Sequence, residues 1–221
     1  TMVSLSNEAL EMDPDIKIIV WPETSVVPSI MYQYYSGTEP KRKEMVNYLL
    51  KYINSSDPVF VIGNYHLVKE KKENGKTVSY DYNSALVFNP PETVIPPDPE
   101  RYYKIHLVPI TEDFPYADKF PFIAKFLIKL GMNFWDKGTE YKVFETDGFF
   151  FSTPICFENT FSDSCRAMYR NGSRCFISLT NDSWAESESA QLQHLAMTVF
   201  RSVENKVPGV VSATTGATCC I

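Results

Sequence analysis

The sequence predicts an α/β protein, with helices packed on a sheet that is buried on both faces. Short apolar runs rich in β-branched residues alternate along the chain with segments whose apolar residues have helical spacing. The apolar runs are hydrophobic at nearly every position, which is typical of strands covered on both sides. No internal repeat is evident in the sequence, so this alternation is the main evidence for the fold class.

Three strands and one helix are predicted in the first half of the chain. The strands are the apolar runs at 15–21 (DIKIIVW), 58–64 (PVFVIGN) and 82–89 (YNSALVFN). Pro22 closes the first strand. The second and third flank a polar turn with Asn74 and Gly75 at its tip, and therefore form a hairpin. The helix at 41–53 has apolar residues on one face and charges on the other.

The second half of the chain continues the alternation after a proline-rich loop at 90–99. We predict an extended segment at 101–109, strands at 148–156, 174–180 and 209–214, and helices at 162–171 and 190–205. The strand at 148–156 ends at Cys156. Asn171 and Gly172 end the short helix before the next strand.

The apolar, aromatic stretch at 120–135 has two interpretations. We expect an amphipathic helix that packs into the core. The alternative is a lid or arm that enters a lipid surface, where Lys119, Lys125 and Lys129 would meet anionic headgroups.

Composition limits the function classes. The 221 residues carry a formal net charge of −6 and no basic stripe, which argues against binding of nucleic acid. The three histidines and five cysteines lack metal-ligand spacing, so we expect no metal site. No apolar run reaches the length of about 18 residues that a membrane span needs. The chain starts at Thr1 and stops at Ile221 directly after an apolar stretch, so we expect both ends to be cut.

Three reactive side chains follow apolar strands, where open α/β sheets place their sites. They are Glu23, Lys104 and Cys156. Each alone is more often a structural residue. Together they fit nucleophilic catalysis, because a cysteine with a free pKa of about 8.5 needs a base and a positive neighbour to attack a carbonyl at neutral pH. Glu23 is the candidate base, and Lys104 would hold the thiolate and then the oxyanion.

These segments resemble the nitrilase superfamily of carbon–nitrogen hydrolases, and most closely its membrane branch, the apolipoprotein N-acyltransferases. The resemblance covers nearly the whole chain, from Asp15 to Gly216. It rests on WPET (21–24), YKIHLVP (103–109) followed by Glu112, ICFE (155–158), LTNDSW (179–184), and QHL (193–195) with Arg201 and Glu204.

The resemblance implies an α-β-β-α sandwich of the nitrilase type. It implies a single catalytic domain over 1–221 that is incomplete at both ends, with membrane helices and a first strand upstream and closing strands downstream. It also implies the site: Glu23 as general base, Lys104 as charge stabiliser, Cys156 as nucleophile, Glu112 and Glu158 in support, and Asn181 and Trp184 in contact with substrate.

The implied reaction moves a fatty acyl chain from a phospholipid, through a thioester on Cys156, to the N-terminal α-amino group of a diacylglyceryl apolipoprotein. It needs no cofactor, and nucleic acid is not a partner. The resemblance places the catalytic domain on the periplasmic side of a bacterial inner membrane, with the present chain soluble or peripheral by itself. The alternatives are a soluble nitrilase-type amidase and a catalytically silent domain that binds lipid or protein.

Several polar residues near these motifs have a second interpretation. Asn181, Asp182 and Trp184 are either turn residues or part of a pocket wall. We expect Gln193 and His194 to be structural, and Cys165 and Cys175 to be packing residues.

Overall fold

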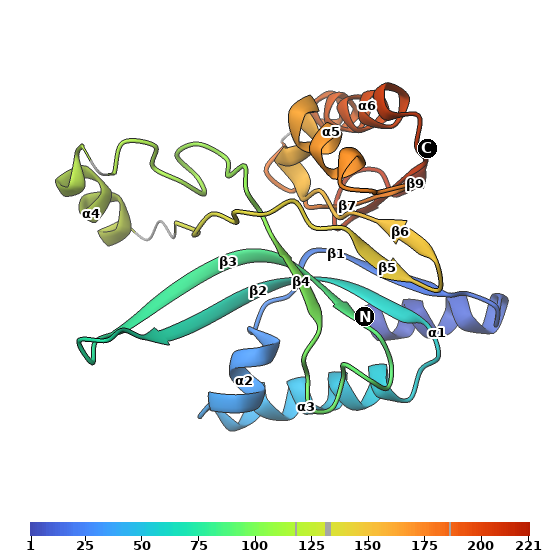
Figure 1. Cartoon of the computed structure of the whole chain (residues 1–221), viewed down its shortest axis with the longest axis horizontal. Helices are drawn as coiled ribbons and strands as arrows, with labels where there is room; N and C mark the ends of the chain where they lie inside the picture. The colour runs from blue at the N-terminus through green and yellow to red at the C-terminus, as the bar shows by residue number, and fades with distance from the viewer. Residues whose placement is uncertain (118, 131–133, 186) are drawn as a thin grey trace.

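Two sheets lie face to face in the computed structural model, and helices cover the outer side of each sheet (Figure 1). The structure describes residues 1–117, 119–130, 134–185 and 187–221. Starting from the helices at the bottom of Figure 1, the layers follow the order helix, sheet, sheet, helix. The expected α-β-β-α sandwich is therefore confirmed.

The helices and strands have the following bounds. The helices are α1 (Met2–Met12), α2 (Ile30–Ser36), α3 (Pro40–Asn54), α4 (Pro121–Lys129), α5 (Ser162–Arg170) and α6 (Glu188–Asn205), with a 3₁₀ helix η1 at Cys156–Thr160. The strands are β1 (Ile18–Val26), β2 (Val59–Lys71), β3 (Thr77–Phe88), β4 (Glu100–Tyr103), β5 (Phe144–Thr146), β6 (Phe149–Phe151), β7 (Phe176–Thr180), β8 (Gly209–Ala213) and β9 (Cys219–Cys220).

The larger sheet has the strand order β1-β2-β3-β4, and the smaller has the order β7-β8-β9. The pairs β1–β2 and β7–β8 are parallel, whereas β2–β3, β3–β4 and β8–β9 are antiparallel. The strands β5 and β6 form a separate two-stranded ribbon. In Figure 1, α1, α2 and α3 lie under the larger sheet, and α5 and α6 lie above the smaller one.

Strand β2 shows why the predicted strands are apolar at nearly every position and do not alternate between apolar and polar residues. Val59 and Val61 pack into a cluster between the two sheets, whereas Phe60 and Ile62 pack into a second cluster with α1 and α3. Successive side chains of a strand point to opposite faces, and here both faces are covered. A continuous apolar run is the result.

Several predicted strands have different bounds in the structure. The hairpin strands are longer than predicted, with Val59–Lys71 in place of 58–64 and Thr77–Phe88 in place of 82–89. The strand predicted at 15–21 does not close at Pro22 but continues to Val26, which is possible because β1 is an edge strand and needs no donor from the proline. The predicted strand at 148–156 ends at Phe151. Beyond it, only Ser152 and Ile155 form isolated bridges to β7. The helices α1 and α2 were not predicted.

The expectation that the stretch at 120–135 packs into the core is wrong. Helix α4 stands apart from the layers (Figure 1), and Phe122 and Phe126 are 68% and 60% exposed. Residues 131–133 of that stretch lie outside the described residues. Within the part of the chain that the structure describes, no helix combines the length and the apolar character that crossing a membrane requires.

Candidate functional site

A cavity of about 670 Å³ opens where the ends of several elements meet. Glu23 and Cys156 both line it, as do Glu112, Asn181 and Trp184. Asn181 and Trp184 therefore form part of the cavity wall, and Asn181 also accepts a turn hydrogen bond from the N–H of Ser183 at 3.2 Å, so both interpretations of this motif apply. The cavity has the size of sites that take drug-sized ligands, about 300–1,000 Å³.

A bulge in β1 presents Glu23 to the cavity. The pairing with β2 is regular up to Trp21 and resumes only at Val26, so the residues between them loop out. Gly63 of β2 permits this loop, because a Cβ there would lie 2.2 Å from the carbonyl oxygen of Pro22 and 2.7 Å from the Cα of Glu23. Glu23 is nevertheless buried, with 6% of the residue exposed.

Lys104 follows β4 and is buried against two carboxylates. Its Nζ lies 2.9 Å from Oε1 of Glu112 and 3.3 Å from Oε1 of Glu23. Burial acts to lower the pKa of Lys104, but the negative charges of Glu23 and Glu112 outweigh it and raise the pKa above its usual value. Lys104 therefore keeps its positive charge at neutral pH, buried next to the carboxylates of the site.

Asn83 joins the two carboxylates and was missed by the sequence reasoning. Its Nδ2 donates to Oε1 of Glu23 at 2.7 Å and, more weakly, to Oε1 of Glu112 at 3.4 Å. The sequence held a signal, because Asn83 stands in the buried half of an apolar strand, where a polar side chain needs a partner.

Glu112 is held by the loop that carries it. Its Oε2 accepts a hydrogen bond from the backbone N–H of Val108 at 2.8 Å, while Oε1 faces Lys104. Ile110, in the turn between them, has a φ of 74°, which is strained for a β-branched residue. The turn thus aims one oxygen at the ammonium and keeps the other bound to the backbone.

Cys156 lies at the first position of η1 with a φ of 50°, in the left-handed region. Burial raises the pKa of its thiol to about 12; Glu23 adds to the rise, and Lys104 opposes it. The thiol is consequently protonated at neutral pH. Attack of the sulfur on a carbonyl therefore needs a base that removes the thiol proton, which is the role expected of Glu23.

Glu158 does not line the cavity. It is fully buried, and burial raises the pKa of its carboxyl. Its Oε1 accepts hydrogen bonds from the hydroxyl of Tyr102 at 2.7 Å and the N–H of Ile105 at 2.8 Å, and its Oε2 accepts from the N–H of Ile155 at 2.8 Å. Glu158 therefore ties the chain beside Lys104 to the chain before Cys156.

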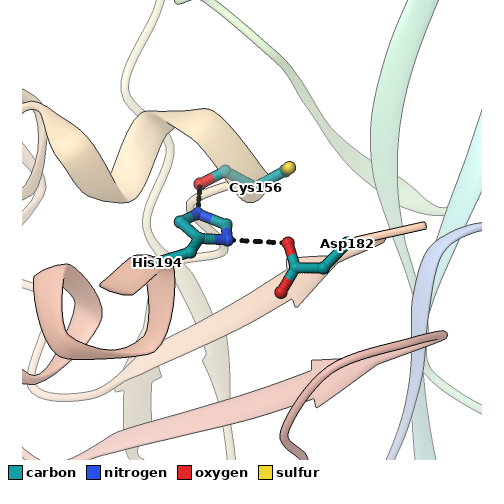
Figure 2. Close-up of side chains that lie close together, drawn as sticks. All are labelled: Cys156, Asp182 and His194. Carbon is teal, nitrogen blue, oxygen red and sulfur yellow. Dashed lines mark hydrogen bonds and ion pairs between the residues drawn. The ribbon is translucent and has the colours of Figure 1, made fainter. Parts of the chain in front are cut away.

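His194 and Asp182 lie beside the cysteine (Figure 2). Nδ1 of His194 is 2.7 Å from Oδ1 of Asp182, and Nε2 is 3.0 Å from the backbone oxygen of Cys156. The sulfur points away from the ring in Figure 2, so the arrangement is not that of a Cys-His catalytic pair. The three side chains are close enough to share a metal ion by distance alone. Both ring nitrogens already face oxygen acceptors, however, so we assign no metal ligand here.

Known proteins are similar to this chain both in fold and in sequence. Among solved structures, a carbon–nitrogen hydrolase from Helicobacter pylori G27 has a TM-score of 0.63 at 16% identity, covering 96% of this chain and 65% of that one. Saccharomyces cerevisiae Nit3, a nitrilase-superfamily member, has a TM-score of 0.60 at 16% identity, covering 99% and 73%. At these identities the likeness establishes the fold.

Sequence relatives are closer. Apolipoprotein N-acyltransferase 1 of Treponema pallidum (strain Nichols) is 43% identical over 221 residues, covering 100% of this chain and 40% of that protein. An apolipoprotein N-acyltransferase of Geobacter metallireducens is 34% identical over 214 residues, covering 97% and 37%. The chain thus spans about 40% of the length of these relatives. The sequence pattern of the carbon–nitrogen hydrolases matches residues 1–220. The chain belongs to the carbon–nitrogen hydrolase family.

Proposed function

We propose that the protein is an apolipoprotein N-acyltransferase, which moves a fatty acyl chain from a phospholipid to the N-terminal α-amino group of a diacylglyceryl apolipoprotein. The observation that carries this proposal is the buried Glu23–Lys104–Glu112 cluster, which opens with Cys156 into one cavity large enough for an extended apolar ligand. The 43% identity to a named acyltransferase over the whole chain supports the same reaction.

In the first step, Glu23 takes the proton of the Cys156 thiol while the sulfur attacks the ester carbonyl of the phospholipid. The resulting oxyanion is stabilised by the positive charge of Lys104. When the tetrahedral intermediate collapses, the ester C–O bond breaks and the leaving alkoxide receives the proton from Glu23. A lysophospholipid departs, and the acyl chain remains on Cys156 as a thioester.

In the second step, the α-amino group of the acceptor attacks the thioester carbonyl. Glu23, again a carboxylate, takes a proton from the attacking nitrogen. The C–S bond breaks, and the sulfur recovers a proton from Glu23 as the amide leaves. Because the thiol has a pKa of about 12, Glu23 is needed in both steps: it removes the thiol proton during the first attack and returns a proton to the sulfur when the thioester breaks.

The exposed helix α4 fits a substrate that resides in a membrane. Its apolar side chains, including Phe122, Phe126 and Ile128, face solvent rather than the core. Lys125 and Lys129 lie on the same helix and can meet anionic headgroups. We propose that α4 enters the lipid surface on the periplasmic side of a bacterial inner membrane, where both substrates reside.

A soluble amidase would use the same three residues with water in place of the amine. The size of the cavity and the exposed apolar helix both favour a lipid over a small amide.

Mass spectrometry of the acyl-enzyme tests the proposal. The full-length protein is incubated with phosphatidylethanolamine vesicles without acceptor, and we expect one acyl adduct that maps to Cys156. The adduct is lost in Cys156→Ala and kept in Cys165→Ala, a matched control because Cys165 is an equally buried thiol away from the cavity. Absence of the adduct, together with ammonia release from small amides, would favour the amidase.

A further inference from the structure

The contacts of His194 define its charge. Nε2 faces a peptide carbonyl oxygen, and Nδ1 faces a carboxylate oxygen. A peptide carbonyl oxygen and a carboxylate oxygen only accept hydrogen bonds, so both ring nitrogens must carry hydrogens to satisfy them. A neutral imidazole would set a lone pair against one of these oxygens at 2.7 or 3.0 Å. The geometry therefore favours the imidazolium.

The surrounding charges agree with this assignment. Burial acts to lower the pKa of His194, but Asp182 outweighs it, with smaller contributions from the Cys156 carbonyl and Glu23, so the pKa is raised. The cation Arg201 of the same helix is turned toward Glu204 and the carbonyl of Thr160. Lys104 is already paired with two carboxylates.

The residue that His194 contacts is strained. Cys156 has a φ of 50°, in the left-handed region that is unfavourable for a non-glycine residue, so this conformation persists only where its surroundings hold it. His194 binds the carbonyl of that residue, while the sulfur projects to the other side (Figure 2).

We propose that the Asp182–His194 pair positions the nucleophile: the imidazolium holds the carbonyl of Cys156 and keeps the backbone in the conformation that turns the thiol away from the His194 ring. His194 is thus a positioning residue that acts through the backbone of Cys156, without contact to the reacting sulfur. Its effect on rate rests on the proposed function, whereas its charge does not.

The charge is tested by nitrogen NMR of histidine-labelled full-length protein at pH 7. The pair of ring resonances that is absent from His194→Gln should have both nitrogens protonated. The imidazoles of His66 and His106 should be neutral, because burial lowers the pKa of both, that of His66 to about 4. A neutral His194 would overturn the proposal, whether or not the protein transfers acyl chains.

The positioning role is tested by the rate of acyl-enzyme formation. We expect His194→Ala to lower this rate about 100-fold, because a displacement near 1 Å at a reacting group costs that much. His194→Gln, which keeps a donor toward the carbonyl but carries no charge, should recover about tenfold of the loss. Thr198→Val is the matched control, since it removes a buried hydroxyl one turn along the same helix and should leave the rate near that of the native protein.

The results separate the two proposals. If the native protein forms no acyl adduct, the proposed function fails, and the NMR result alone then decides whether His194 is positively charged. If the native protein is acylated and both His194 variants match Thr198→Val, positioning by His194 is refuted. Should His194→Ala not fold, His194→Gln is compared with the control in its place, and a native rate in that variant refutes the role.

Discussion

Replacement of Gly63 by alanine should displace the proposed base without removing it. The added Cβ would lie 2.2 Å from the oxygen of Pro22 and 2.7 Å from the Cα of Glu23, whereas ordinary contact begins at 3.4 Å. Both neighbours are backbone atoms and cannot rotate away. The bulge that carries Glu23 must therefore move by about 1 Å, which predicts an approximately 100-fold slower formation of the acyl-enzyme.

The same change should destabilise the fold. Overpacking of a buried site costs about 1–3 kcal/mol, which lowers the melting temperature by roughly 2–12 °C in a domain of this size. The assays are acyl-adduct formation followed by mass spectrometry and thermal unfolding. Gly75→Ala is the control, because Gly75 has a φ of 78° but no neighbour within 4 Å, so that variant suffers backbone strain far from the site. A folded Gly63→Ala protein with native acylation kinetics would refute the argument that this close approach positions Glu23.

Three further predictions follow from the site and the surface. Glu112→Gln should lower the rate of acyl-enzyme formation at pH 8 about tenfold, because it removes the shorter ion pair of Lys104, a charged hydrogen bond worth on the order of 1.5–3 kcal/mol; a native rate in the folded variant would contradict this. The double change Phe122→Ser and Phe126→Ser should reduce binding of this chain to anionic phospholipid vesicles at least tenfold in co-sedimentation. The melting temperature should not change, because both rings are exposed, and native binding by the double variant would show that α4 does not contact the membrane. Burial lowers the pKa of His66 to about 4, so between pH 6.5 and 4 the unfolded chain binds a proton that the folded chain does not, and the free energy of unfolding should fall by about 3 kcal/mol as the pH drops through that window. Denaturant titrations should find this loss absent in His66→Leu.

The clustering of the candidate catalytic residues followed from sequence reasoning because it depends on strand ends. Glu23 and Cys156 stand at the ends of apolar runs, and the structure brings both to one cavity, with Lys104 3.3 Å from Glu23. Their roles remain proposals. The bulge that aims Glu23 could not be read from the strand pattern, since Pro22 looks like an end signal and its tolerance depends on β1 being an edge strand.

The contacts of His194 could not be predicted for a different reason. It lies 12 residues from Asp182 and 38 from Cys156, so no local spacing connects them. Helix α4 shows a related limit. Helical periodicity identifies an apolar face, but it does not say whether that face meets the core, a membrane or solvent. Only the tertiary arrangement showed that Phe122 points outward.

Because Lys104 lies between two carboxylates, the loss of one negative charge leaves the other in place. Glu23 becomes neutral each time it accepts a proton in the proposed cycle, yet Glu112 still lies 2.9 Å from the ammonium. The lysine thus keeps a counter-ion at every stage and has no reason to release its own proton into a buried space. Glu112 takes no part in the proposed proton transfers, but its charge lets Glu23 gain and lose a proton while Lys104 keeps the positive charge that stabilises the oxyanion.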